Sequence, residues 1–317
     1  MSGNFPYYKV YSRGKEITPL IRGALVELRL EDRSGVHADA LELELADAGE
    51  LSWPSEGVEM GVEFGVSGVK REHQRFAIDQ AEHAGPPARF TVSATAADFT
   101  SQARAPRERS WSVKPFGELV TEIAGEYGYG AKVQPESLAS VTLQHVDQAG
   151  QSDLALIHQI AEEHGAVFKP VDRIWWVRSY DALGEPVATI RPGDVSTWRA
   201  HFVPRRRYAS VAAAYQDYDQ AERVQVVVGD GEPQKVMDKT FADEATARTN
   251  ARAALGRSER EARQLTLRMP GRPDLASQQV IALDGFRDRV DGRWLITQVT
   301  HTINKRGYSC RVQCEGV

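Results

Sequence analysis

Two histidines and two adjacent glutamates lie in the segment QSDLALIHQIAEEHGA, residues 151–166, and these residue types could bind a metal ion or transfer protons. On a helix, two ligands share a face when they are three or four residues apart. His158 and His164 are six residues apart, so their side chains point about 120° away from each other. The neighbours Glu162 and Glu163 diverge by about 100°. The spacing therefore predicts no metal site within this segment.

A site that combines this segment with a more distant residue is the remaining possibility. His145 lies in a separate segment and could meet His158 in space, although nothing in the spacing requires it. Leu154, Ile157 and Ala161 form a stripe that is typical of a helix face packed on a core. We therefore interpret the segment as scaffold.

Other signatures of chemistry are missing from the sequence. There is no G-x-S-x-G, P-loop or G-x-G-x-x-G motif, and no pair of carboxylates is marked as an acid–base couple. Cys310 and Cys314 alternate along one strand, which separates them by about 13 Å, whereas a disulfide needs Cα atoms within about 7 Å. We expect two buried thiols without a disulfide, and we predict no catalytic residue, no cofactor and no metal ligand.

Composition narrows the class of protein. The 317 residues are 41% hydrophobic and 26% charged, with a net charge of −5, which argues against a dedicated nucleic-acid binder. We interpret the basic runs Arg104 to Arg109 and Arg205 to Arg207 as a solvated linker and a loop, with a docking surface for an acidic partner as the alternative. No apolar run is long enough to span a membrane, and the N-terminus lacks the apolar core of a secretion signal, so we expect folding in a cytoplasm.

The order of elements predicts an α+β fold that is mainly β. Period-two alternation in LELEL (41–45), VEMGVEFGV (58–66) and the pair 76–78 and 90–92 predicts a β domain over residues 1–100. The polar stretch from Ser101 to Ser110 is interpreted as a linker.

Helical spacing and capping signals follow the linker. Phe116 to Tyr127 and Ser152 to Gly165 are predicted helices, with Ser152 as an N-cap, and VFKPVDRIWWVR (167–178) is a predicted hairpin. These elements make an α/β middle domain within residues 101–184. A second β domain follows over 185–317, with an inserted helix over 242–262 and strands at 210–215, 223–229, 264–269, 280–283 and 294–303.

A weak internal repeat links the two β parts. Residues 76–94 align without a gap on 294–312, where Ile78 matches Ile296, Gln80 matches Gln298, and His83 matches His301. Aromatic residues coincide at Phe76 and Trp294 and at Phe90 and Tyr308. The pattern leaves open both a duplicated β domain and chance similarity. For His83 and His301 it favours matched strand-end hydrogen bonds over catalysis.

Several runs resemble the late-control D family, the baseplate hub proteins of contractile phage tails. They are WSVKPFGELVTEIAGEYG, HVDQAGQSDLALIHQIAEEHGAVF with IWWV, LRMPGRPDLASQQVIALDGF and DGRWLITQVTHTINKRGYS. The resemblance covers the chain from about residue 20 to the end and extends to the hub part of type VI secretion spike proteins. It implies two related barrel-like β domains with an α/β middle domain. It also implies a homotrimer whose six similar barrels form a pseudo-six-fold ring around a channel.

The function implied by the resemblance is structural, not enzymatic. The ring would join the tail tube to the central spike in a phage tail or tailocin particle, which assembles in the host bacterial cytoplasm. Its partners would be the spike, tail tube, tape-measure and baseplate wedge proteins, with no membrane span and no specific nucleic-acid binding. We expect the β domains to line the channel and residues 111–180 to project outward. Trp111, Trp175 and Trp176 are candidate contact residues, although core packing fits each of them better.

Two alternatives remain at this point. A cell-wall or metal-dependent hydrolase would use His145, His158 or His164, and bound zinc or loss of activity in His158→Ala would favour it. An adaptor that loads effectors onto a secretion spike would bind a toxin in place of tail-tube protein.

Overall fold

The computed structural model describes residues 6–49, 51–55, 57–66, 68–96, 101–204, 207–217, 220 and 222–317 of the chain. The chain divides into two compact units, and each unit is assembled from three separate segments of the sequence. Unit 1 comprises Met1–Thr100, Pro186–Arg199 and Thr266–Cys314. Unit 2 comprises Ser101–Glu185, Ala200–Leu265 and Glu315–Val317.

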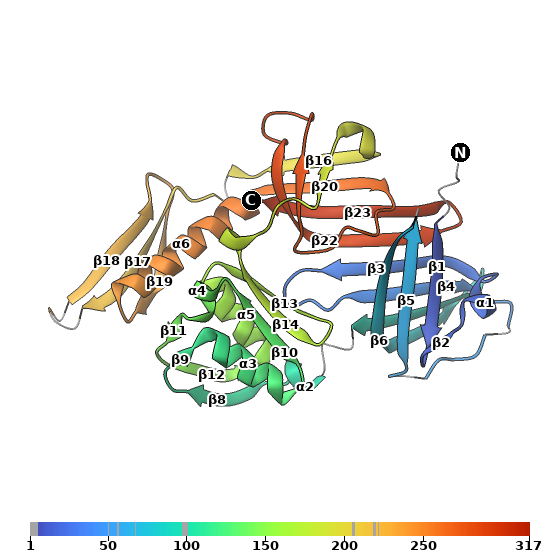
Figure 1. The fold of residues 1–317 in the computed structure, drawn as a ribbon, viewed down its shortest axis with the longest axis horizontal. Helices are drawn as coiled ribbons and strands as arrows, with labels where there is room; N and C mark the ends of the chain where they lie inside the picture. Colours follow the sequence, from blue (N-terminus) through green and yellow to red (C-terminus); the bar gives the residue numbers. More distant parts are fainter. Residues whose placement is uncertain are drawn as a thin grey trace. The chain divides into compact units, whose positions relative to one another are not determined.

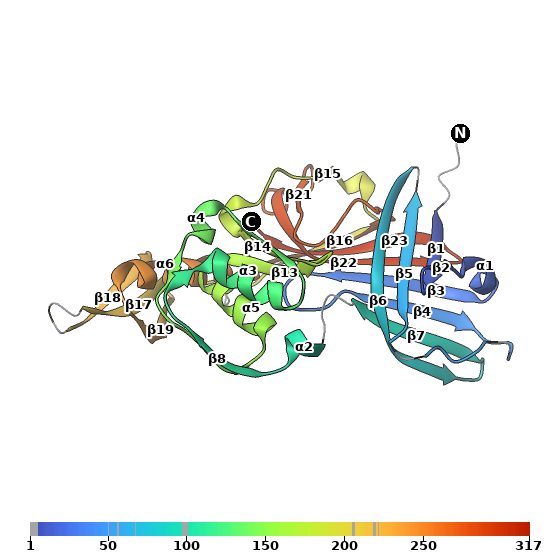
Figure 2. The ribbon, with the colours of Figure 1, turned by 60° about the horizontal axis from the view of Figure 1, so that its bottom comes forward.

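One large, mostly antiparallel sheet supplies the strands of unit 1 (Figures 1 and 2). Its strands follow one another in the order β16-β20-β23-β22-β3-β4-β7-β6-β5-β1-β2, and a side branch pairs β15 with β21 and β21 with β22. The strands are β1 (Tyr7–Ser12), β2 (Lys15–Glu16), β3 (Leu25–Arg33), β4 (Ala40–Ala46), β5 (Glu59–Val66), β6 (Val69–Ala84), β7 (Arg89–Ala96), β15 (Ala188–Ile190), β16 (Thr197–Phe202), β20 (Arg263–Pro270), β21 (Val280–Leu283), β22 (Gly292–Asn304) and β23 (Gly307–Gly316). The short helix α1 (Thr18–Ile21) follows β2, and the 3-10 turn η2 (Pro192–Asp194) follows β15.

The sheet has one apolar face because its strands alternate. In β4, the side chains of Leu41, Leu43 and Leu45 are buried, whereas those of Glu42 and Glu44 are partly exposed. All the strands that the alternation predicts in this part of the chain are present. What the alternation does not reveal is the long-range pairing of β3 with β22, which aligns Glu27–Arg33 with Gln298–Asn304.

Unit 2 contains two groups of elements. The first has the helices α2 (Ser101–Arg104), α3 (Phe116–Glu126), α4 (Glu136–Ala139) and α5 (Asp153–Glu163), the strands β8 (Arg107–Trp111), β9 (Lys114–Pro115), β10 (Gly130–Gln134), β11 (Thr142–Leu143), β12 (Val146–Gln151), β13 (Ala166–Val171) and β14 (Ile174–Ser179), and the 3-10 turn η1 (Tyr180–Ala182). The second has β17 (Ser210–Asp217), β18 (Glu222–Gly229), β19 (Gln234–Phe241) and α6 (Glu244–Glu261).

The helices of unit 2 follow the predicted caps. Ser152 caps α5 by accepting a hydrogen bond from the Ala155 backbone at 3.2 Å, and Gly165 follows the helix with φ +64°. The predicted hairpin is β13 and β14, which pair antiparallel, with β10 added parallel to β14. The predicted helix over 242–262 is α6, which packs on the β18-β17-β19 sheet through a cluster that includes Val211, Phe241 and Ala251.

The predicted linker is wrong for most of its length. Ser101–Arg104 form α2, and Arg107–Trp111 form β8, which pairs antiparallel with β12. Arg107 and Arg109 alternate with exposed Glu108 and Ser110, so this strand does have a period of two. Its inward-facing residues are arginines, and apolar alternation therefore does not reveal it. Of the second basic run, Arg205 and Arg206 lie outside the described residues, and Arg207 forms an exposed ion pair with Glu259.

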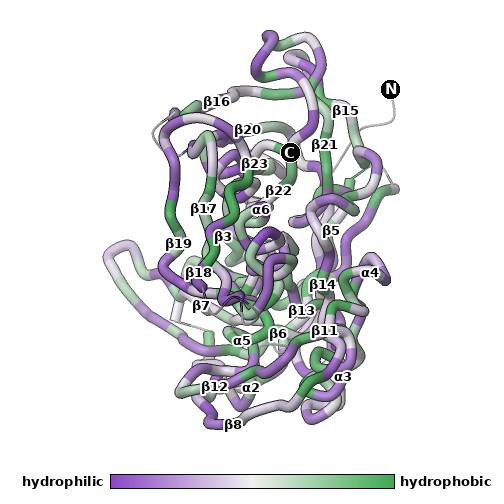
Figure 3. Tube along the Cα trace, turned by 90° about the vertical axis from the view of Figure 1, so that its left-hand side faces the viewer, coloured by the Kyte–Doolittle hydropathy of each residue, from purple (hydrophilic) through white to green (hydrophobic). Residues whose placement is uncertain are grey.

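The fold is mainly β, as predicted, and it contains one large, mostly antiparallel sheet. Its barrel-like closure and the three-domain division at 1–100, 101–184 and 185–317 stay predictions. The two aligned stretches of the repeat are both antiparallel hairpins, β6–β7 and β22–β23. Figure 3 shows hydrophobic and hydrophilic residues interleaved along the chain, and no helix among the described ranges is long and apolar enough to cross a membrane.

Candidate functional site

The structure places the two histidines of the segment 151–166 in different surroundings. His158 lies on α5 with its Nε2 3.7 Å from Glu162 Oε1, one helical turn away. His164 ends the same helix with its ring 6.3 Å from that of Phe116. His145 is exposed and pairs with Asp147 at 2.9 Å. Within the part of the chain that the structure describes, no group of three or more His, Cys, Asp or Glu residues could hold a metal ion.

Helix α5 begins with a buried acidic residue, Asp153. Its side chain is fully buried and accepts hydrogen bonds from Arg109, from the hydroxyl of Tyr127 and, at 2.8 Å, from the amide of Gln148. Arg107 Nε lies 3.6 Å from the same carboxylate. Burial alone would raise the pKa of Asp153, but the hydrogen bonds from Tyr127, Gln148 and Arg109 outweigh it, so the pKa lies below its usual value.

The ion pairs and hydrogen bonds around Asp153 connect elements of unit 2 and leave the carboxylate buried. Arg107 and Arg109 both come from β8, and both also pair with Glu126 at the end of α3, at 2.9 and 2.6 Å. Asp153 therefore connects the N-terminus of α5 to β8, and Glu126 extends the connection to α3. Sequence reasoning missed the network because it assigned both arginines to a linker.

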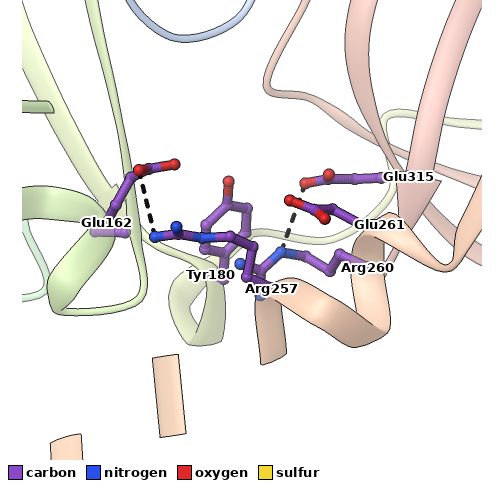
Figure 4. A pocket seen from close by; sticks show the side chains of 7 residues that line it. Glu162, Tyr180, Arg257, Arg260, Glu261 and Glu315 are labelled. Atoms are coloured by element: carbon purple, nitrogen blue, oxygen red, sulfur yellow. Dashed lines mark ion pairs between the residues drawn. The ribbon is translucent and has the colours of Figure 1, made fainter. Parts of the chain in front are cut away.

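A second charged cluster lines a small pocket of about 90 Å³ in unit 2. Its lining side chains come from α5, η1, α6 and the end of β23, and they are Glu162, Tyr180, Arg257, Arg260, Glu261 and Glu315. Figure 4 shows the hydroxyl of Tyr180 pointing into the space between Glu162 and Glu315. Arg257 pairs with Glu162 at 3.3 Å and Arg260 with Glu315 at 3.6 Å, while the Arg260 guanidinium lies 3.5 Å from the centre of the Tyr180 ring.

Glu315 is the least solvated carboxylate in this pocket. Its side chain is 19% exposed, and its contact with a cation is the ion pair with Arg260. Burial therefore raises the pKa of Glu315 even though Arg260 lowers it. Burial likewise raises the pKa of Tyr180 to about 12. Both arginines that line the pocket pair with glutamates that also line it, so its geometry is that of an ion-pair junction.

Cysteine, histidine and tyrosine meet in the core of unit 1. His301 Nδ1 lies 2.9 Å from the Tyr308 hydroxyl and 3.2 Å from Cys310 Sγ, and all three side chains are buried. A catalytic Cys–His pair needs a lowered thiol pKa, whereas burial here raises the pKa of Cys310 to about 11. The cluster is therefore packing, and Cys310 and Cys314 are buried thiols outside any disulfide, as predicted.

The candidate contact tryptophans are mostly core residues. Trp175 is fully buried and Trp111 is 7% exposed. Trp176 is partly exposed on β14, with Lys132 Nζ 4.6 Å and Arg178 Cζ 5.8 Å from its ring centre. Of the three, Trp176 alone keeps surface that a partner could contact.

Comparison with known proteins gives this fold a family. The family model for the phage tail baseplate hub (GPD) matches residues 65–307. A probable baseplate hub protein of Escherichia phage P2 is 25% identical over 360 aligned positions, which cover 98% of this chain and 93% of that protein.

Two solved structures have a similar fold. A tail protein from Neisseria meningitidis MC58 has a TM-score of 0.75 at 14% identity, with 98% of this chain and 97% of that one covered. The Escherichia coli c3393 protein, a component of the type VI secretion system, has a TM-score of 0.60 at 14% identity, with 96% and 76% covered. Because the family model spans most of the sequence, this chain belongs to the phage tail baseplate hub family, a family of structural proteins of contractile tails and not of enzymes.

Proposed function

We propose that this chain forms a homotrimeric ring that joins the tail tube to the central spike in a contractile tail particle. Membership of the baseplate hub family is the single observation that carries the proposal. A hub works through shape and interface area, and its obligate interfaces often bury about 2,000 Å² or more. That role needs no catalytic centre, in keeping with charged clusters that tie elements together.

The two hairpins of the repeat support a pseudo-six-fold ring. His83 lies opposite Phe90 in the β6–β7 register, with ring centres 6.0 Å apart. His301 and Tyr308, their counterparts on β22 and β23, also have ring centres 6.0 Å apart. A duplicated domain would leave such matched pairs, and three copies of two similar domains would present six similar contacts to a six-fold tube.

The remaining features of the proposal follow from the ring. The two β domains line its channel, and the α/β domain within residues 101–184 projects outward. The spike lies on one side, tail-tube and tape-measure proteins lie on the other, and wedge proteins surround the ring. The particle is a phage virion or a tailocin, assembled in the cytoplasm of the host bacterium.

Native mass spectrometry of the purified protein, alone and co-expressed with the spike protein of the same particle, tests the proposal. We expect a complex of three hub chains with three spike chains. A chain that stays monomeric with both the spike and the tube protein present would contradict the ring. Negative-stain images of the complex would then test the position of the α/β domain, which should decorate the outside and leave the channel open.

A further inference from the structure

A polar groove of about 600 Å³ lies on the outward face of the unit 1 sheet. Its lining comes from β3, β22, β23 and β20, which are consecutive neighbours in the sheet and lie side by side in Figure 1. Along β22, the lining residues Gln298, Thr300, Thr302 and Asn304 occur at every second position. The groove is therefore the solvent-facing side of the strands whose other side forms the core.

On the β3 side of this groove, both carboxylates have partners within the molecule. Glu31 pairs with Arg29 at 3.3 Å and also with Arg33. Glu27 accepts a hydrogen bond from Asn304 at 3.2 Å. Glu31 is therefore neutralised by cations of its own strand, whereas Glu27 keeps its charge and is held by a neutral amide.

The opposite side of the groove carries arginines that form no ion pair with another described residue. Arg268 on β20, Arg311 on β23 and Arg306 in the turn between β22 and β23 all line the groove and are exposed. None of the three forms an ion pair with a residue in the described part of the chain, and the lining contributed by β20, β22 and β23 contains no carboxylate. A chain with a net charge of −5 thus presents a local cationic surface beside neutral hydrogen-bonding groups.

Arginine and neutral polar groups fit a carboxylate ligand. The guanidinium group binds a carboxylate through two parallel hydrogen bonds, and hydroxyl and amide side chains hydrogen-bond the backbone beside it. We propose that this groove docks an acidic segment of a partner protein, with Arg268 and Arg311 as its principal contacts and Arg306 at its end. The proposal rests on the hub function for the expectation that partner proteins surround the chain.

Nucleic acid fits this surface less well than an acidic protein segment. Three arginines that neutralise three phosphates give a salt-dependence slope of only about −2.7, far below the about −10 of a dedicated DNA binder. Protein interfaces, in contrast, commonly rely on a few arginines within a polar rim. DNA is therefore kept as an outcome of the test.

The test uses the full-length protein and a fluorescein-labelled hexaglutamate peptide, with binding followed by fluorescence polarisation at low salt. Arg268→Gln/Arg311→Gln removes the two principal contacts. Arg287→Gln/Arg289→Gln is the matched control. These two arginines are also exposed in unit 1, form no ion pair with another described residue, and lie outside the groove. Both double variants change the net charge equally.

We expect the groove variant to bind hexaglutamate about tenfold more weakly than the native protein, a difference of about 1.4 kcal/mol. The control should bind within about twofold, and a hexaglutamine peptide should not bind the native protein. Equal weakening in both variants would reduce the effect to net charge and overturn the proposal, as would a native protein that ignores hexaglutamate. Binding of a duplex DNA oligonucleotide that is stronger than that of the peptide would replace it with a nucleic-acid surface. Native mass spectrometry of the same variants with the spike protein distinguishes the groove proposal from the hub proposal. A complete ring that does not bind the peptide would contradict the groove proposal and leave the hub proposal standing.

Discussion

At the scale of single residues, the carboxylates of Asp153 and Glu315 both connect elements of unit 2, and their pKa values shift in opposite directions. Asp153 has hydrogen-bond donors on several sides, and its pKa is lowered. Glu315 has one cation at 3.6 Å, and its pKa is raised. Hydrogen bonding to the charged form outweighs burial in the first case and does not in the second.

Asp153→Asn should destabilise the protein. Arg109 and Arg107 would lose their buried counter-charge, and we expect a loss of about 3 kcal/mol in the free energy of unfolding, at the low end for a broken buried pair because both arginines stay partly exposed. Because the folded-state pKa is lowered, the contribution is present above the usual carboxyl pKa and is lost as the pH falls through the folded value. Urea unfolding at pH 7 measures the loss. Asp147→Asn is the control, since Asp147 is 68% exposed and should change stability by less than about 0.5 kcal/mol.

Glu315→Gln should have the opposite effect. A raised carboxyl pKa means that Glu315 stabilises the fold fully below the usual carboxyl pKa and loses this contribution as the pH rises through the folded value. At pH 7.5 a neutral glutamine avoids the burial penalty of the charge, so the Tm should rise, and the gain should shrink towards pH 4.5. Differential scanning fluorimetry follows both trends. The exposed Glu259→Gln serves as the comparison; a lower Tm for Glu315→Gln at pH 7.5 would mean that the ion pair with Arg260 dominates.

At the scale of elements, the predictable strands were those whose inward side chains are apolar. The strands β4, β5 and β17 and the hairpin β13–β14 alternate or cluster apolar residues and were all predicted. The strand β8 was missed because its inward positions hold Arg107 and Arg109. Their positive charges are neutralised by Asp153, and this contact exists only in the tertiary structure. The ion-pair pocket was missed for the same reason, since Glu162 and Glu315 are far apart in sequence and no local spacing connects them.

Helix α3 offers a test of local propensity. Gly125 is exposed within the helix, and a Cβ built at this position meets nothing within 4 Å. Gly125→Ala should therefore stabilise the protein by about 0.5–1 kcal/mol, because alanine loses less backbone entropy in a helix. At Gly117, in the same helix, a new Cβ would lie 3.0 Å from that of Ala139, so Gly117→Ala should lack this gain. Chemical denaturation of both variants distinguishes propensity from packing.

At the scale of the whole molecule, sequence order and spatial order differ. Unit 1 combines its first hundred residues with segments from the second half of the chain, and β3 pairs on one side with β4 and on the other with β22. Local patterns cannot reveal which distant strand completes a sheet, although the family resemblance anticipated the kind of protein. The chain's division into units is therefore a result of tertiary pairing.

The fragment 1–100 should fail to fold as a soluble monomer. Without residues 266–314, β3 loses its pairing with β22 and exposes a long strand edge, which favours aggregation. Size-exclusion chromatography of the fragment, expressed alone and together with residues 186–317, provides the measurement. A soluble, cooperatively unfolding fragment 1–100 would instead support an independent first β domain.

The pairing of β3 with β22 also has a consequence for synthesis on the ribosome. Arg33 leaves the ribosome long before its partner Gln298 is made, a delay of about 13–50 s at about 5–20 residues per second. During that interval the edge of β3 has no native neighbour on one side, while unit 2 is already emerging. Nascent chains of this protein should consequently depend on chaperones that hold the unpaired strand. Slower growth at low temperature should improve folding only if the chaperone supply keeps pace with translation.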